Sequence, residues 1–249
     1  MRVTLILAAV VPAVFLLVQV YRADRLEKEP LSMLLSLLLW GVIAAELAAL
    51  VEQLGVLVLE RLLSSTQTLD WDLSLIERAA AGTQDSVTHD VLLYFVVVAV
   101  SEEGVKYLLL RWRTWRSPEF NCCFDGVVYA AFLSLGFALW ENIHYVLAYG
   151  FATAVARAVT AVPGHACFGV FMGTWYGLAK RASLRGERGR SCLFRALAFL
   201  VPCVLHGVYD FIAAARLLEL GWFFLPFIAL MFLSSFLLVR RLSRGDSYL

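Results

Sequence analysis

Three ionisable side chains, Glu102, Glu103 and Lys106, interrupt an otherwise apolar stretch between Val91 and Leu110. A charge at the centre of a membrane helix costs roughly 3 kcal/mol on insertion scales, and such groups usually face a polar interior and have a function. Glu102 and Lys106 are four residues apart, so they could form a purely structural ion pair on one helix face. Such a pair does not need Glu103, which points about 100° away from Glu102 on a helix. The extra carboxylate therefore favours a functional site.

Further ionisable groups occur at membrane depth in three other apolar segments: Glu141, His165, His206 and Asp210. At the rise of an α-helix, Glu141, His165 and Asp210 lie roughly 10 Å from the outer ends of their helices, His206 roughly 15 Å and Glu102 roughly 18 Å. Groups far apart in the sequence are therefore expected to share one layer in the outer half of the membrane. This convergence predicts a single site.

Helical spacing supports the grouping. His206 and Asp210 are four residues apart, so both face the same way. His165 begins a series of residues spaced by four whose other members are glycines, namely Gly169, Gly173 and Gly177. Because a stripe of small residues lets helix backbones approach closely, we expect His165 to lie on the face that packs inward.

Carboxylate and imidazole ligands from separate helices can hold Zn²⁺ and leave one position open for water. Such a metal lowers the pKa of the water to about 7. We expect Glu141, His165 and His206 to be ligands. Asp210 is either a further ligand or the acceptor that orients His206.

The double glutamate would supply the base. Glu102 or Glu103 would take the proton of the water, and Lys106 would hold the other carboxylate ionised or stabilise the oxyanion. Together these groups predict hydrolysis of an amide inside the membrane. His144 differs slightly in helical phase from Glu141, and its role stays open.

The composition requires a membrane protein. Of 249 residues, 61% are hydrophobic and 16% are charged, with a mean hydropathy of +0.77; a soluble domain is about 45–50% apolar and about 25% charged. We expect one integral-membrane domain over residues 1–249, with the lipid bilayer as its surroundings. The net charge of +1 and the absence of a basic tail give no reason to expect a nucleic-acid partner. The five cysteines follow no metal or disulfide spacing.

The elements that must position these residues are helices. The fold class is predicted to be an all-α, polytopic bundle of about seven transmembrane helices, over residues 3–20, 31–59, 90–110, 125–147, 157–179, 196–215 and 222–239. Of the 21 Lys and Arg residues, 15 fall within 21–30, 111–119, 180–195 and the C-terminal tail. With seven spans these four regions lie on one side, which the positive-inside rule makes cytoplasmic. The N-terminus is then outside and the C-terminus is cytoplasmic.

The segment 64–90 is the one long polar connection, and it is poor in Lys and Arg. The topology places it outside. Leu69, Leu73, Ile76 and Ala80 recur at helical spacing, which favours a short amphipathic helix lying in the membrane interface.

The ordered set of motifs resembles the PrsW family. No single motif is specific, but the ordered set is, and it extends from about Tyr21 to Phe211: Asp24-Arg25-x-Glu27-x-Glu29-Pro30, Glu102-Glu103-x-x-Lys106, Phe124-Asp125-Gly126-Val127-Val128-Tyr129, Phe137-x-x-x-Glu141-Asn142, His165-Ala166 and His206-Gly207-x-x-Asp210-Phe211. The resemblance implies an intramembrane protease, treated as a metallopeptidase, in the plasma membrane of a bacterium or archaeon. It implies a first, site-1 type cut in a membrane-anchored anti-sigma factor, on its extracytoplasmic side.

The same resemblance implies that Glu102, Glu103 and His165 are essential, with Glu141, His206 and Asp210 in the same site. The family is distantly similar to CAAX prenyl proteases, which have been argued to use a Glu-activated water without a bound metal. Both a zinc-bound water and a metal-free water are therefore open.

Three other classes of protein use similar groups. An ion- or proton-coupled transporter could use the Glu, His and Asp residues as a relay, but no repeated pair of broken helices is visible. Glu141-x-x-His144 suggests a di-iron carboxylate oxidase, but that class needs two such motifs. A seven-span receptor would not explain why charges on four helices share a layer.

Overall fold

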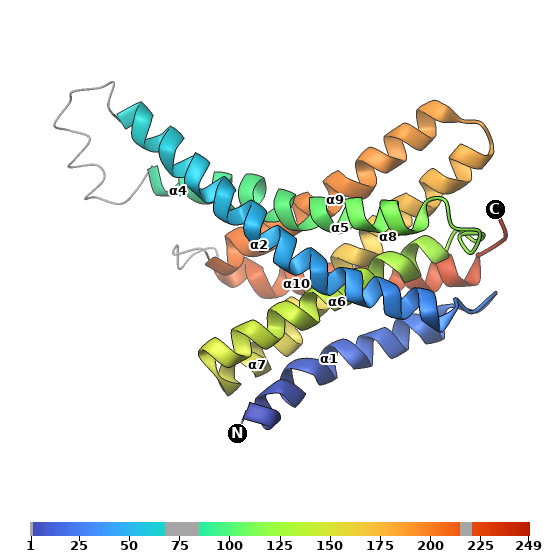
Figure 1. Ribbon diagram of the computed structural model, residues 1–249, viewed down its shortest axis with the longest axis horizontal. Helices are drawn as coiled ribbons and strands as arrows, with labels where there is room; N and C mark the ends of the chain where they lie inside the picture. The colour runs from blue at the N-terminus through green and yellow to red at the C-terminus, as the bar shows by residue number, and fades with distance from the viewer. Residues whose placement is uncertain (1, 68–84, 215–220) are drawn as a thin grey trace.

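The computed structural model describes residues 2–67, 85–214 and 221–249. The described chain is helical and contains no β-strand, only an isolated bridge between Cys122 and Tyr248. The helices run in the order α1 (Arg2–Ala23), α2 (Leu31–Gln67), α4 (Asp85–Val91), η1 (Leu92–Ala99), α5 (Val100–Thr114), α6 (Asp125–Tyr149), α7 (Phe151–Val159), α8 (Ala161–Leu184), α9 (Arg188–Ala214) and α10 (Gly221–Arg244). Figure 1 shows them as one bundle in which α2 runs obliquely to α1 and α6.

The predicted all-α membrane bundle is confirmed. Within the described ranges, six helical stretches are long and apolar enough to cross a membrane: Thr4–Ala23, Leu31–Leu63, Asp125–Tyr149, Phe151–Leu184, Arg188–Ala214 and Trp222–Arg244. The remaining expected span, 90–110, corresponds to the consecutive segments α4, η1 and α5. Its buried charges, Glu102, Glu103 and Lys106, lower its hydropathy. The orientation of the two termini across the membrane stays a prediction.

Several boundaries differ from the sequence-based expectation; for example, α9 begins at Arg188 rather than near residue 196. Helix α2 continues to Gln67 rather than ending near residue 59, and α4 begins at Asp85 rather than near residue 90. The expected span 157–179 is broken at Thr160, so its first residues belong to the separate helix α7. Gly150, with φ of 86°, ends α6 and starts α7. The amphipathic helix expected over 69–80 lies outside the described residues.

Helix α6 is the centre of the bundle, because α2 packs on one side of it and α8 on another. Both contacts require glycine. A Cβ on Gly136 would lie 2.2 Å from the carbonyl oxygen of Leu38 on α2, and a Cβ on Gly173 would lie 2.3 Å from that of Gly126. The small-residue stripe of α8 therefore faces α6, as predicted from its spacing.

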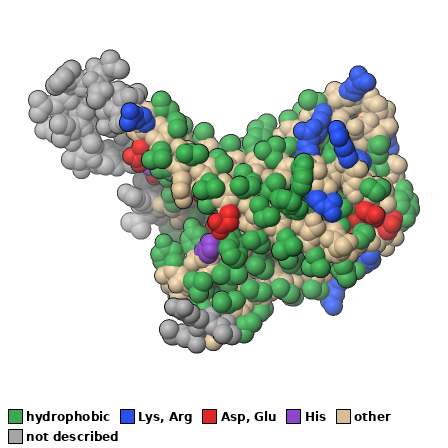
Figure 2. Space-filling model, viewed as in Figure 1, with side chains coloured by type: hydrophobic (Ala, Val, Ile, Leu, Met, Phe, Trp, Pro, Cys, Tyr) green, Lys and Arg blue, Asp and Glu red, His purple; other side chains and the backbone are tan. Residues whose placement is uncertain are grey.

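The outer surface of the bundle is largely apolar. Figure 2 shows apolar side chains over most of the visible face, with most Lys and Arg gathered toward the end where α8 meets α9 and where the C-terminus lies. The middle of the bundle exposes a broad apolar surface, as lipid contact requires.

Candidate active site

Lys106 is the hub of a buried polar cluster. Its Nζ lies 3.0 Å from Oε2 of Glu102, 2.8 Å from Oε1 of Glu103 and 3.1 Å from Nδ1 of His165. Its side chain is fully buried, and the ammonium also lies 3.7 Å from the ring centroid of Phe137. The three N–H groups are thus directed at two carboxylates and one imidazole. Lys106 connects α5 to α8 across the face of α6.

His206 joins the cluster from α9. Its Nδ1 lies 2.9 Å from Oε1 of Glu103 and 3.9 Å from Oε2 of Glu102, while its Nε2 lies 3.2 Å from Oδ2 of Asp210. The predicted pairing of His206 with Asp210 on one helix face is therefore seen in the structure. The ring is held between a carboxylate of α5 and one of its own helix.

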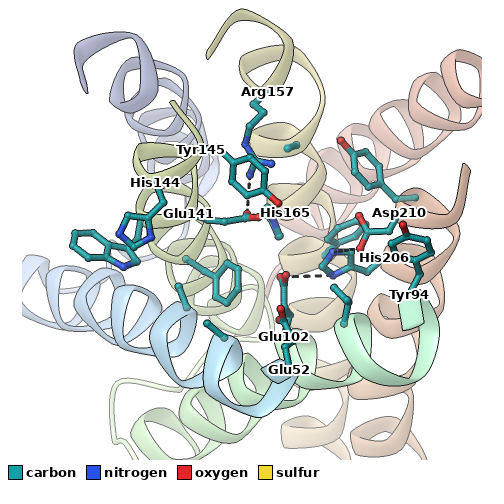
Figure 3. Close-up of a pocket in the computed structure, with 18 of the residues that line it drawn as sticks. Glu52, Tyr94, Glu102, Glu141, His144, Tyr145, Arg157, His165, His206 and Asp210 are labelled. Atoms are coloured by element: carbon teal, nitrogen blue, oxygen red, sulfur yellow. Dashed lines mark hydrogen bonds and ion pairs between the residues drawn. The ribbon is translucent and has the colours of Figure 1, made fainter. Parts of the chain in front are cut away.

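His165 is held in the same way. Its Nε2 lies 2.9 Å from Oε2 of Glu141, and its Nδ1 faces Lys106. The His165 and His206 rings are perpendicular, with centroids 5.3 Å apart. Each imidazole thus has one nitrogen toward the centre of the cluster and the other toward an outer carboxylate, Glu141 or Asp210. Figure 3 shows this arrangement around a common hollow.

Arg157 is a site residue that the sequence reasoning missed. It lies on α7, and its Nη2 is 2.8 Å from Oε2 of Glu141. Its Nε donates to Oδ1 of Asn142 at 3.1 Å, and its guanidinium lies 4.0 Å from the ring centroid of Tyr145. A signal existed: Arg157 is the only Lys or Arg between Arg116 and Lys180. An isolated charge in so long an apolar region indicates function.

The cluster lines a cavity of about 410 Å³ to which α2, η1, α5, α6, α7, α8 and α9 all contribute. Glu102, Glu141, His165, His206 and Asp210 reach this cavity, whereas Glu103 and Lys106 lie behind its wall. Glu52 of α2 also lines the cavity, together with Glu102 (Figure 3).

The rim of the cavity carries Glu46, Trp140 and His144. The indole Nε1 of Trp140 donates to Oε1 of Glu46, and the rings of Trp140 and His144 lie 4.8 Å apart. His144 is exposed and makes no contact with His165 or His206 that would place it in the buried cluster. The geometry therefore places His144 at the edge of the cavity.

The described residues contain one buried set at this site with donor atoms within 4.8 Å of one another: Glu102, Glu103, His165 and His206. This set shares both histidines with the predicted ligands Glu141, His165, His206 and Asp210, but not the two outer carboxylates. Glu141 and Asp210 lie on the far side of the imidazole rings. From these positions, Glu141 and Asp210 can orient the imidazoles of His165 and His206.

The sequence was compared with known protein families and proteins. Residues 29–239 match the family described as "PrsW family intramembrane metalloprotease". Relatives named "Protease PrsW" include one from Geobacillus kaustophilus, 37% identical over 86% of this chain and 81% of the relative, and one from Bacillus subtilis, 30% identical over 90% and 88%. A third, from Clostridioides difficile, is 30% identical over 89% and 83%. No solved structure matches the chain.

These similarities cover all the motifs of the buried cluster. The family is one of intramembrane proteases, which favours a peptidase over the transporter, oxidase and receptor alternatives.

Proposed function

Because this chain belongs to the PrsW family and is therefore an intramembrane protease, we propose that it cuts a single-span, membrane-anchored protein near the extracytoplasmic side of the bilayer. The proposed substrate is of the anti-sigma-factor kind, and the cut is the first, site-1 type cut. The observation that carries the proposal is the buried cluster around Lys106, which lies beside a cavity at membrane depth.

We assign the general base to Glu102. Its side chain is 8% exposed and lines the cavity, whereas that of Glu103 is fully buried behind it. The hydrogen bond from Lys106 fixes the Glu102 carboxylate at the cavity wall, where it can take a proton from a water molecule. The water oxygen attacks the carbonyl carbon, the C–N bond breaks, and the protonated Glu102 returns the proton to the leaving amine. Lys106 has its N–H groups engaged and acts as a positioning residue.

The family description implies a metal, and the donor set fits zinc. Two imidazoles and two carboxylates, all buried and within 4.8 Å of one another, are ligand types that zinc takes. Glu103, His165 and His206 would hold the ion, a two-His, one-Glu set that leaves a position open for water. A bound zinc ion would lower the pKa of that water and polarise the carbonyl of the substrate. Glu141 and Asp210 would orient the two imidazoles.

Lys106 directly affects the binding of this metal. Its ammonium contacts three of the four donors, Glu102, Glu103 and His165. A zinc ion and the ammonium therefore compete for the same lone pairs. The same geometry also suits a metal-free reaction in which Lys106 alone positions Glu102. The metal content of purified, active protein distinguishes the two routes.

The test is cleavage of a single-span substrate in proteoliposomes. Glu102→Gln and His165→Ala should each lower the rate at least about 100-fold, since a general base contributes 10²–10⁴-fold. Glu46→Gln is the matched control, because Glu46 is a carboxylate on the cavity rim outside the cluster. Cleavage retained by both cluster variants would contradict the assignment. Activity that survives exhaustive chelation would select the metal-free route.

A further inference from the structure

A second cavity lies between α5 and α9, outside the active site. Its volume is about 490 Å³, and the residues that line it lie within 104–111 of α5 and 192–199 of α9. The two helices touch at Gly104, where a Cβ would lie 3.5 Å from the Phe199 ring. From there they diverge toward the end of the bundle where the C-terminus lies (Figure 1). The result is an open groove, and its lining shares no residue with that of the active-site cavity.

Two arginines line this groove from opposite sides, Arg111 on α5 and Arg195 on α9. Both guanidiniums act electrostatically on the hydroxyl of Tyr107, which also lines the groove. No ion pair within the described ranges involves either arginine. Nε of Arg195 donates to the Ser191 carbonyl at 3.3 Å, which leaves its Nη groups for another acceptor. Among the described residues, the groove therefore has two positive charges in its lining and no carboxylate.

The rest of the groove wall is apolar, and this apolar surface continues toward the middle of the membrane. Leu108 lines the groove with its side chain 62% exposed, and the exposed Val100 lies two turns further along the same face of α5. Val100 is eleven residues from Arg111, roughly 16 Å along the helix and so about half the hydrocarbon thickness of a bilayer. On α9, Ala196 lines the groove and the exposed Leu200 continues its row. A hydrocarbon chain on this track would span one leaflet.

The two arginines lie at the level where lipid phosphates are expected. Arg111 is in the last turn of α5, and the next residue, Trp112, is 69% exposed, as is typical of aromatic side chains among the head groups. Most Lys and Arg gather at this end of the bundle (Figure 2), which the positive-inside rule assigns to the cytoplasmic leaflet. Anionic lipids give that leaflet its negative surface potential. A guanidinium binds a phosphate through paired hydrogen bonds, so charge and depth both fit a phosphate head group with a hydrocarbon tail.

We propose that the groove between α5 and α9 binds an anionic phospholipid, with its phosphate between Arg111 and Arg195 and one acyl chain along Leu108. The Tyr107 hydroxyl donates to the same phosphate. A zwitterionic lipid would add an ammonium beside the two guanidiniums, and this like-charge contact favours anionic head groups. The lipid bridges α5 to α9, the helix that carries His206. This binding site is separate from the proposed cleavage reaction.

The test is native mass spectrometry of the full-length protein in detergent, titrated with palmitoyl-oleoyl phosphatidylglycerol or with the matching phosphatidylcholine. The first phosphatidylglycerol should bind at least about tenfold more tightly, because it keeps the charge-assisted hydrogen bonds without the like-charge contact. The double variant Arg111→Gln, Arg195→Gln should lose this preference. The double variant Arg188→Gln, Arg240→Gln removes the same charge from exposed arginines outside the groove and should keep it. Equal losses in both would show general charge attraction and would overturn the proposal.

Ala196→Trp tests the apolar part of the groove at constant charge. The indole would fill the track beside Leu108, so the first phosphatidylglycerol should bind at least about tenfold more weakly, because its acyl chain loses several buried methylene groups. Leu193→Trp adds an indole at an exposed position of α9 outside the groove and should leave the affinity unchanged. Unchanged affinity in Ala196→Trp, or displacement of the lipid by excess inorganic phosphate, would overturn the lipid assignment. These measurements involve no cleavage, so their outcome is independent of the proposed protease substrate.

Discussion

Nζ of Lys106 lies 3.1 Å from Nδ1 of His165, although 59 residues separate them in the sequence. This contact joins α5, which carries Glu102 and Glu103, to α8, which carries His165. Because the same ammonium also bonds both glutamates, one cation fixes the relative positions of the base and an imidazole.

The first prediction concerns this ammonium. Lys106→Met should lower cleavage at least about 100-fold, because Glu102 loses the ammonium that fixes the position of its carboxylate. It should also raise the affinity for zinc, since the competing charge is gone. Isothermal titration with zinc and a cleavage assay measure both effects. Lys180→Met, which removes an ammonium that donates to the Trp115 carbonyl and lies over the Trp115 and Phe120 rings, outside the buried cluster, should change neither. A lower zinc affinity in Lys106→Met would contradict the competition.

The second prediction separates the two glutamates. Glu103 is fully buried between Lys106 and His206, and removal of one partner of a buried ion pair costs about 3–5 kcal/mol. Glu103→Gln should therefore lower the thermal unfolding midpoint as well as activity. Glu102→Gln should abolish activity with a smaller loss of stability. Glu187→Gln, at an exposed ion pair, is the control. Equal midpoints for the two variants would contradict the distinction.

The third prediction concerns Arg157. Its ion pair with Glu141 places a positive charge behind the carboxylate that contacts His165. Arg157→Met should lower kcat, and Arg157→Lys should restore part of it, because lysine keeps the charge but loses the second contact to Asn142. A double-mutant cycle with Glu141→Gln should show non-additive losses of about 1–3 kcal/mol. Additive losses would show that Arg157 acts independently of Glu141.

The fourth prediction concerns His144. It lies at the cavity rim against Trp140, outside the buried cluster. His144→Ala should lower cleavage by less than about tenfold, whereas loss of a catalytic group costs at least about 100-fold. It should leave metal content unchanged, in contrast to His165→Ala. Elemental analysis of both variants, made alongside the cleavage assay, checks this. Loss of the metal in His144→Ala would contradict this prediction and would show that His144 belongs to the metal site.

The fifth prediction concerns helix packing. Gly173→Ala places a Cβ 2.3 Å from the Gly126 carbonyl oxygen, so α6 and α8 must separate. Overpacking of this kind costs about 1–3 kcal/mol. The unfolding midpoint in detergent should fall, and activity should fall with it. Gly189→Ala adds a methyl group in open space and should be neutral or slightly stabilising, because alanine is the better helix former. An unchanged midpoint for Gly173→Ala would contradict the close packing.

The sequence alone located most of the site. Charges in an apolar run are costly, so Glu102, Glu103 and Lys106 stood out, and the helical rise placed His165, His206 and Asp210 in the same layer. The spacing of Gly169, Gly173 and Gly177 identified the inward face of α8. These features depend on local geometry, which the sequence fixes one helix at a time.

The remaining features depend on the rotation of each helix about its axis and on the packing between neighbouring helices. Only the packed bundle shows that Glu141 and Asp210 lie outside the imidazole rings, and that Glu52 reaches the cavity. The break at Thr160 decides that Arg157 points at Glu141, and no periodicity in the sequence predicts it. Depth along a helix follows from counting residues, but rotation and lateral distance between helices follow from side-chain packing over the whole fold.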